Sequence, residues 1–375
     1  MIKLENVTKA FETPAGTVVA ADRINMEVAD GEICVLLGPS GCGKTTTLKM
    51  INRLIEPTSG KIYIDGKDTD RYDPVDLRRT IGYVIQQIGL FPNMTVEENV
   101  CVVPKLLGWD MAKARKRASE LLATINLEPA LFLKRYPREL SGGQQQRVGV
   151  ARALAADPPV LLMDEPFGAI DPINREVIQD EFLKMHRRLK KTVMFVSHDI
   201  DEAVKMADKV AIFRAGRLEQ FDSPDQVLAH PVNAFVADFV GTDRTLKRLR
   251  LVKVRDAVQP KSPCVCGTDG VERAVALMND EGYEFVVIVD GEGRPLGYVD
   301  DSVRDRTGVV GEHRAPLPAT VRLEEDLRAA VSTMFMHDVR WLACIDGDGR
   351  FSGFVTQRGI TRLLGKTYRE TGAQH

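Results

Sequence analysis

The sequence ICVLLGPSGCGKT, residues 33–45, is the most informative segment of this chain. Its apolar part, residues 33–37, predicts a strand that is buried on both faces. A glycine-rich turn follows, and the residues from Lys44 to Leu54 have the pattern of a helix. The pattern G-x-x-x-x-G-K-[ST] between a strand and a helix indicates a loop that binds nucleotide phosphates.

This loop offers phosphate several kinds of contact. Its glycines let backbone N–H groups turn toward phosphate oxygens, and the helix N-terminus adds the positive end of its dipole. Lys44 supplies a charge to the β- and γ-phosphates, and the Thr45 hydroxyl can ligate Mg²⁺. We therefore expect ATP and Mg²⁺ as cofactors. The expected nucleotide-binding residues of the loop are Gly38, Pro39, Ser40, Gly41, Cys42, Gly43, Lys44, Thr45 and Thr46.

Two carboxylates end a second apolar run, Val160 to Met163. Ligands bind at the carboxyl ends of parallel strands, so Asp164 is placed to hold Mg²⁺ directly or through water. Glu165 is placed to polarise an attacking water as general base. Alone, this acidic pair could equally cap the following turn; behind a phosphate-binding loop, catalysis is the favoured interpretation.

A second donor-rich helix N-terminus occurs at Leu140-Ser-Gly-Gly-Gln144. Ser141 and the two glycines form another surface suited to phosphate. Two such surfaces in one chain suggest that each nucleotide site is completed by another copy, so we expect a homodimer.

The octapeptide LSGGQQQR, residues 140–147, resembles the signature of ABC ATPases. The resemblance covers about residues 1 to 240 and implies an α/β fold. The expected architecture is a P-loop NTPase domain with a mixed sheet and a helical subdomain at about 90–156. It also implies that ATP is held between one P-loop and the partner's signature, with closure on ATP and opening after hydrolysis.

Other elements of the family follow in order. Gln86 resembles the Q-loop glutamine, Asp171 lies in a D-loop and His198 in an H-loop, while Phe11 stands where an adenine-stacking ring is usual. The resemblance implies catalytic roles for Glu165, His198 and Gln86, and Mg²⁺ ligation by Thr45, Gln86 and Asp164. Further implied nucleotide contacts are Phe11, Ser141, Gly142, Gly143, Gln144 and Asp171.

Residues 48–60, 81–92 and 141–156 resemble the ATPase subunits of quaternary-amine importers. This implies import of glycine betaine, proline betaine, carnitine or choline through a separate membrane permease. A substrate-binding protein or domain outside the cytoplasm is a further implied partner, and residues 86–92 are expected to receive a coupling helix of the permease. An importer of another small solute, such as an amino acid, is the alternative. A soluble ABC ATPase outside transport usually has two cassettes or a coiled-coil insertion, which this chain lacks.

The C-terminal part contains an internal repeat, because VDGEGRPLGYV at 289–299 matches IDGDGRFSGFV at 345–355. Each copy reads as strand, hairpin turn and strand, and a helical segment precedes it. The pair resembles a tandem CBS module, an α+β unit. We expect a linker at 241–256, the first repeat at 257–311 and the second at 312–368.

The repeats depart from the CBS pattern G-h-h-[ST]-x-x-D, in which h is apolar. The second copy, Gly353 to Gly359, keeps the threonine and loses the acid, and the first, Gly297 to Val303, loses both. We expect a regulatory or dimer-stabilising module, with an ionic-strength or cyclic-dinucleotide response, rather than the usual adenine-nucleotide sensing. Because a pure ligand sensor needs no hydrolytic base, Glu165 argues against a chain that is mainly a CBS sensor.

Composition bounds the remaining possibilities. The net charge of −2 gives no indication of nucleic acid. No apolar run approaches the roughly 20 residues of a membrane span, and the N-terminus lacks a signal region. We therefore expect a peripheral protein on the cytoplasmic face of the inner membrane. The basic stretch 244–255 is interpreted as a solvated helix face or, alternatively, a contact with anionic lipid.

Cysteines and histidines add little to this assignment. Cys264 and Cys266 are separated by one residue and are expected to be reduced thiols rather than a metal or redox pair. The histidines other than His198 are interpreted as structural; they are His186, His230, His313, His337 and His375.

Overall fold

The computed structural model describes residues 1–14, 16–86, 89–168, 170–259 and 262–372. Two compact units separate after Gly241. Unit 1 holds residues 1–227 and 231–241, and unit 2 holds residues 228–230 and those from Thr242 onward. No helix in the described ranges is both long enough and apolar enough to cross a membrane.

A six-stranded sheet in unit 1 has the order β10-β9-β3-β8-β7-β6. Five of these strands are parallel, and β10 at the edge runs antiparallel to β9. The bounds are β3 (Ile33–Leu37), β6 (Ile81–Val84), β7 (Val160–Asp164), β8 (Thr192–Val196), β9 (Lys209–Arg214) and β10 (Arg217–Asp222). Every residue of β3, β7 and β8 is buried, as their continuous apolar sequences predict.

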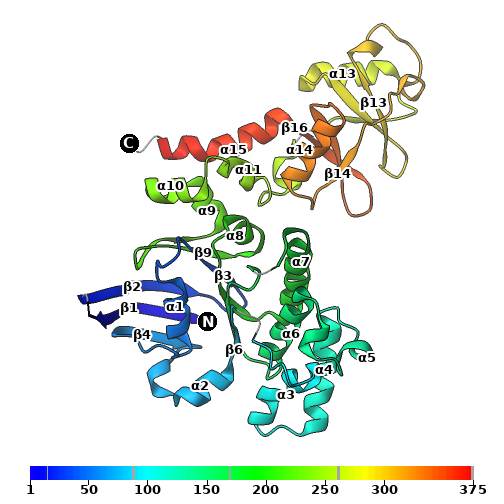
Figure 1. The fold of residues 1–375 in the computed structure, drawn as a ribbon. Coiled ribbons are helices and arrows are strands. Elements are labelled where there is room, and N and C mark those ends of the chain that lie inside the picture. Colours follow the sequence, from blue (N-terminus) through cyan, green and yellow to red (C-terminus); the bar gives the residue numbers. More distant parts are fainter. Residues whose placement is uncertain (15, 87–88, 169, 260–261, 373–375) are drawn as a thin grey trace. The chain divides into compact units, whose positions relative to one another are not determined.

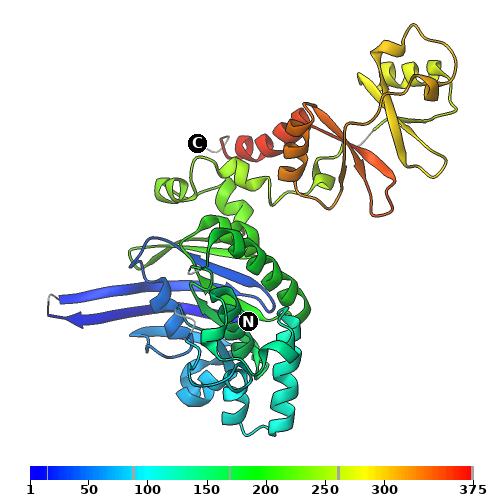
Figure 2. The same ribbon diagram turned by 45° about the vertical axis from the view of Figure 1, so that its right-hand side comes forward.

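A second, antiparallel sheet has the order β2-β1-β4-β5. Its strands are β1 (Ile2–Thr13), β2 (Gly16–Val28), β4 (Ser59–Ile64) and β5 (Lys67–Asp68). The strands β1 and β2 form a long ribbon that projects beyond the rest of the sheet (Figure 2). Register shifts along β1 mark bulges, which bend and twist such ribbons.

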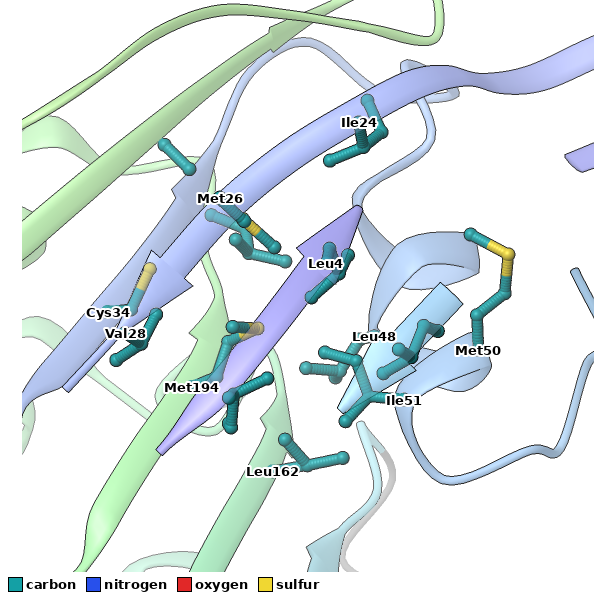
Figure 3. Packing of buried hydrophobic residues seen from close by; sticks show 14 of the residues in the cluster. Leu4, Ile24, Met26, Val28, Cys34, Leu48, Met50, Ile51, Leu162 and Met194 are labelled. Atoms are coloured by element: carbon teal, nitrogen blue, oxygen red, sulfur yellow. The ribbon is translucent and has the colours of Figure 1, made fainter. Parts of the chain in front are cut away.

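The helix α1 (Lys44–Ile51) packs between the two sheets. Figure 3 shows Leu48 and Ile51 of α1 beside Leu4 of β1 and Leu162 of β7, in one apolar cluster. Burial of such side chains stabilises by about 1.5–3 kcal/mol each. This core fixes the start of α1 at the carboxyl end of β3. The helix ends three residues earlier than predicted, because Arg53 adopts a positive φ of 52°.

Four helices occupy the segment for which the sequence predicts a helical subdomain (Figure 1). They are α3 (Val96–Leu106), α4 (Met111–Thr124), α5 (Pro129–Phe132) and α6 (Gly142–Leu154). A capping box between Thr95 and Glu98 starts α3, and Asp110 caps α4. The remaining helices of residues 1–241 are α2 (Pro74–Thr80), α7 (Pro172–Leu189), α8 (Ile200–Met206), α9 (Pro224–Ala229) and α10 (Ala234–Val240).

Unit 2 contains two three-stranded sheets with identical topology. In each, the first pair of strands is parallel and the second antiparallel. The strands are β11 (Cys264–Cys266), β12 (Phe285–Val289), β13 (Pro295–Asp300), β14 (Thr320–Arg322), β15 (Trp341–Ile345) and β16 (Phe351–Thr356). The helices are α11 (Arg244–Arg248), α12 (Val254–Ala257), α13 (Val271–Glu281), α14 (Leu327–Met336) and α15 (Gln357–Gly372). The internal repeat inferred from the sequence is therefore confirmed.

The hairpin turns of the two repeats use the same hydrogen bonds. Asp290 accepts from the backbone N–H groups of residues 292 and 294, and Asp346 accepts from those of residues 348 and 350. Phe285 and Trp341, which occupy equivalent positions of the repeats, stack with ring centroids 3.8 Å apart. The stack therefore joins equivalent positions of the two repeats.

The basic stretch 244–255 is not a single solvated helix. It is divided between α11 and α12, and Arg248 is only 3% exposed. The solvated-face interpretation is therefore wrong for Arg248, whose charge is withdrawn from solvent.

Candidate active site

The loop between β3 and α1 has the shape that phosphate binding requires. Gly38 and Gly43 have φ values of 144° and 103°, which side-chain-bearing residues rarely adopt. A Cβ at Gly43 would stand 2.1 Å from the backbone oxygen of Ala20, and one at Gly38 would stand 2.3 Å from that of Phe213. These glycines therefore allow both the turn and its close packing on neighbouring backbone.

Lys44 points into this loop. Its side chain is 6% exposed, and its ammonium group donates to the backbone oxygens of Gly38 (2.6 Å) and Pro39 (2.8 Å). The buried charge is thus held by the curved backbone of the loop. Its role in binding phosphate stays a prediction.

Thr45 and Asp164 are 119 positions apart in the sequence and meet in the structure. The Thr45 hydroxyl donates to Oδ1 of Asp164 over 3.0 Å. Burial raises the pKa of Asp164, while the hydrogen bond from Thr45 and the charges of Lys49 and Lys44 oppose that shift. An aspartate and a hydroxyl are hard oxygen ligands of the kind that Mg²⁺ prefers.

The described residues contain no cluster of three or more His, Cys, Asp or Glu side chains suited to a metal. Mg²⁺ bound with a nucleotide does not need one, because phosphates and water supply most of its ligands. The pair of Thr45 and Asp164 therefore fits a Mg–nucleotide site.

Glu165 and Gln86 form the second pair at this sheet edge. The amide Nε2 of Gln86 donates to Oε2 of Glu165 over 2.9 Å. Glu165 has a φ of 46°, a strained conformation for a residue with a side chain. Its backbone N–H donates to Val196 at the end of β8, so the two strand ends hold it in place. Strain at this carboxylate is consistent with a functional constraint.

His198 lies two residues after the end of β8 and is exposed. Ser197 before it donates through its backbone N–H to Leu36 of β3, so the start of the His198 loop is anchored to the central sheet. Phe11, on β1, is 38% exposed, with the Lys9 ammonium 4.9 Å from its ring centroid. Its adenine-stacking role stays a prediction.

The signature residues form a capped helix start. Ser141 accepts from the backbone N–H of Gln144, and the Gln144 side chain accepts from that of Ser141. Gly142 has open space around it. Within the described residues, no hydrogen bond or ion pair joins the signature to the phosphate loop. Asp171 similarly caps α7 by accepting from Asn174.

Two residues that the sequence analysis does not single out hold the segment after Gln86. Arg152 of α6 donates to the backbone oxygen of Gly89 over 2.7 Å, and burial lowers the pKa of Arg152. Asn99, fully buried, donates to the backbone oxygens of Phe91, Met94 and Thr95. Asn99 lies in the first turn of α3, and its burial, which the sequence does not show, is what identifies this clamp. Residues 87–88 of this segment lie outside the described ranges.

Unit 2 contains a cavity of about 630 Å³ between the two repeats. Its lining includes Thr356, Arg358 and Arg362. Gly359 stands where the usual CBS pattern has an acid, and a Cβ there would lie 2.6 Å from the side-chain amide of Gln259. The side chain of Gln259 therefore occupies the space that such an acid would need.

The six cysteines are free, and Cys264 and Cys266 are exposed on β11. Among the other histidines, His186 bonds the backbone oxygen of Lys191 and His313 that of Thr307, which agrees with structural roles. His375 lies outside the described residues.

Comparison with known proteins assigns the family. The ABC transporter family model matches residues 21–168, and the CBS domain model matches residues 254–302 and 314–366. The osmoprotectant import ATP-binding protein OsmV of Salmonella typhimurium is 54% identical over 375 residues, which cover 98% of each chain. The chain belongs to the ABC transporter ATPases and has C-terminal CBS domains.

Other relatives agree with this assignment. The glycine betaine/carnitine/choline transport ATP-binding protein OpuCA of Bacillus subtilis is 44% identical, over 97% of this chain and 96% of its own. The dimeric ATP-binding cassette MJ0796, in a post-hydrolysis state bound to ADP and Pi, is 38% identical. That structure covers 60% of this chain and 99% of its own, with a TM-score of 0.54. The predicted family and fold class are confirmed.

Proposed function

We propose that this ABC ATPase hydrolyses ATP as a homodimer to energise import of quaternary ammonium osmoprotectants through a separate permease. The proposed solutes are glycine betaine, carnitine, choline and proline betaine. The observation that carries the ATPase part is the meeting of Thr45 with Asp164 and of Gln86 with Glu165 at the carboxyl ends of the strands. The solute class rests on the relatives that span nearly the whole chain.

In this mechanism the P-loop binds the nucleotide phosphates. Backbone N–H groups and Lys44 stabilise their negative charge, because an N-terminal helix end and a buried cation favour anions. Thr45 and Asp164, with Gln86, would hold Mg²⁺, which neutralises charge on the phosphates when bound.

Glu165 is the proposed general base. A carboxylate oxygen accepts the proton of the attacking water, and Gln86 orients the carboxylate through its amide. His198, at the end of β8, contacts the γ-phosphate in this proposal.

The signature is proposed to act on the nucleotide of a second copy. Its helix N-terminus offers donors, yet no polar contact links it to the phosphate loop among the described residues. A dimer in which each P-loop faces the partner's signature would complete both sites.

A membrane permease is the partner that the family implies, and this makes the chain a peripheral component at the inner membrane's cytoplasmic face. Exposed apolar side chains occur on the segment after Gln86 and on α3, including Phe91, Met94 and Leu106. We infer that this surface receives the permease, as predicted for residues 86–92. A substrate-binding protein or domain outside the cytoplasm completes the proposed importer.

Uptake by the reconstituted transporter tests the solute class. Labelled glycine betaine should enter only with ATP, and unlabelled carnitine, choline or proline betaine should compete with it. Competition by common amino acids, with none by quaternary amines, would support the alternative importer instead and contradict the proposal.

The CBS module is proposed to regulate transport or stabilise the dimer. The cavity is lined by Arg358 and Arg362 together with Asp256 and Glu284, so side chains of both charges face it. Position 359 is a glycine rather than an acid, which disfavours recognition of ribose hydroxyls. We expect transport to change with ionic strength or with a cyclic dinucleotide. A transporter lacking residues 244–375 that responded to salt and ligands like the intact one would refute this role.

A further inference from the structure

A buried polar network joins the loop before α7 to the loop that carries His198. Its centre is Glu202 of α8, which is 6% exposed. Oε2 of Glu202 accepts from the Ser197 hydroxyl over 2.7 Å, and Oε1 accepts from the side-chain amide of Gln179 over 3.2 Å. Since Ser197 directly precedes His198, the buried carboxylate fixes the backbone on one side of the histidine.

The other side of His198 belongs to the same network. The backbone N–H of Asp199 donates to the Ser197 hydroxyl oxygen over 3.0 Å. The Asp199 carboxylate then caps α8 by accepting from the backbone N–H of Asp201 over 2.8 Å. Both neighbours of His198 are therefore tied to α8.

Arg175 extends the network to the Asp171 loop. This residue lies in the first turn of α7, and its Nη2 donates to the backbone oxygen of Ile170 over 3.0 Å. Nη1 lies 3.9 Å from Asp199 and Nε lies 4.0 Å from Glu202. The Arg175 guanidinium thus contacts the backbone of Ile170 and the carboxylates of Asp199 and Glu202.

Charge balance makes this arginine hard to replace. Burial raises the pKa of Glu202, and the Ser197 hydrogen bond and the charges of Arg175 and His198 oppose the shift, while Asp199 reinforces it. Removing the cation would leave a buried carboxylate beside a second one, which is a costly arrangement. Arg175 is therefore the neighbouring cation that opposes the effect of burial on Glu202, the acceptor of the Ser197 hydroxyl.

The network is also able to tighten. Nε of Arg175 is buried and has no hydrogen-bond partner among the described residues. It lies 4.0 Å from Oε1 of Glu202, so a small displacement of the guanidinium would turn this ion pair into a hydrogen bond. A movement of the Ile170 backbone would therefore reach Glu202 through a single side chain.

We propose that Arg175 is a positioning residue that couples the Asp171 loop to the His198 loop through Glu202 and Ser197. This rests on the proposed roles of Asp171 and His198 at the nucleotide. Because Asp171 lies in the loop expected to face the partner subunit, the coupling would make the placement of His198 sensitive to the partner. Arg175 of α7, Glu202 of α8 and Ser197 of the loop between β8 and α8 contact no nucleotide themselves in this proposal.

Turnover and nucleotide binding by purified variants test the coupling. Arg175→Met should lower kcat by about tenfold or more, since misplacing a reacting group is expensive even when the chemistry is intact. Its Kd for ATP should stay within about twofold of wild type, because the P-loop is untouched. Arg175→Lys, which keeps the charge without the planar fork, should recover part of kcat. Arg188→Met, an exposed arginine of the same helix, is the matched control and should change neither value.

A double-mutant cycle separates coupling from general damage. Glu202→Gln keeps acceptor and donor atoms for Ser197 and Gln179 but removes the charge that needs Arg175. It should lower kcat with unchanged Kd, and the double variant should be no slower than the slower single variant. If Arg175→Met does not fold, the same double-mutant cycle is measured with Arg175→Lys instead. Additive losses, or wild-type kcat in Arg175→Met, would overturn the proposal.

Measuring kcat of His198→Ala alongside these variants distinguishes failure of the His198 assignment from failure of the proposed coupling. If this variant retained wild-type kcat, the assignment of His198 would fail and the coupling with it. If it lost turnover while the Arg175 and Glu202 variants did not, only the coupling would be wrong.

Discussion

Glu165 combines a strained backbone with a fixed side chain. Its positive φ costs on the order of 1 kcal/mol or more, which the anchoring of its N–H to Val196 and of its carboxylate to Gln86 helps to offset. Positive φ values also occur at turn residues such as Arg53, so the backbone alone does not separate the two roles. The hydrogen bond from Gln86 to the Glu165 carboxylate supports the hydrolytic role that the sequence already favours over capping.

Glu165→Gln should bind ATP, hydrolyse it at least about a hundredfold more slowly and accumulate ATP-bound dimers. The amide retains the hydrogen-bonding shape but cannot accept the proton of water. Steady-state phosphate release and size-exclusion chromatography with ATP measure both effects. Glu120→Gln, at an exposed position of α4, is the control. Turnover at the wild-type rate in Glu165→Gln would show that another group is the base.

Lys44→Ala should lose most nucleotide affinity, by about a hundredfold, because it removes the buried cation held inside the phosphate loop. Equilibrium titration with a fluorescent ATP analogue, together with a thermal melt to establish folding, checks this. A folded variant with unaltered affinity would discredit the phosphate-binding assignment.

The elements of the fold were predictable where a pattern repeats or a motif has fixed spacing. The strand at 33–37 and the duplicated hairpins follow from local sequence, since apolar runs and aspartate-glycine turns carry their own geometry. Sequence also singled out Thr45, Asp164, Gln86 and Glu165 as candidate site residues, and the structure adds which of these side chains bond to one another. The Arg175–Glu202 network could not be predicted from the sequence, because no fixed spacing relates its residues. It is defined only by the packing of α7 against α8.

The stack of Phe285 on Trp341 joins β12 of one repeat to β15 of the other. Trp341→Ala should lower the free energy of local opening around these strands by about 2–3 kcal/mol, through lost burial and lost ring stacking. Trp341→Phe should retain most of it. Hydrogen–deuterium exchange of peptides from β12 and β15 in the full chain measures this change.

Phe335→Ala is the control for this prediction, because Phe335 is 73% exposed and should change opening by less than about 0.5 kcal/mol. Unchanged exchange in Trp341→Ala would mean that the stack does not stabilise the repeat pair.

At the scale of the whole molecule, the proposed nucleotide site has two unlike halves, the P-loop and the signature. The P-loop lies between β3 and α1 of the sheet core, whereas the signature begins α6 of the helical group. If the site spans two chains, the P-loop of one copy is completed by the signature of the other copy. Symmetry then makes two equivalent sites per dimer, and each contains a P-loop from one chain and a signature from its partner.

Mixing two inactive variants tests this composite site. Lys44→Ala disables the P-loop, and Gly142→Asp places a negative charge at the signature helix start, where the open space around Gly142 accommodates a side chain. Each homodimer should be inactive because both of its sites contain the defect. A heterodimer, however, has one site with both defects and one with none. The mixture should therefore regain hydrolysis, up to about a quarter of wild-type sites on random pairing.

Differently tagged variants, purified as heterodimers, should hydrolyse one bound ATP in a single turnover. If proven heterodimers hydrolysed none, the two halves would have to belong to the same chain, and the shared-site dimer would be wrong.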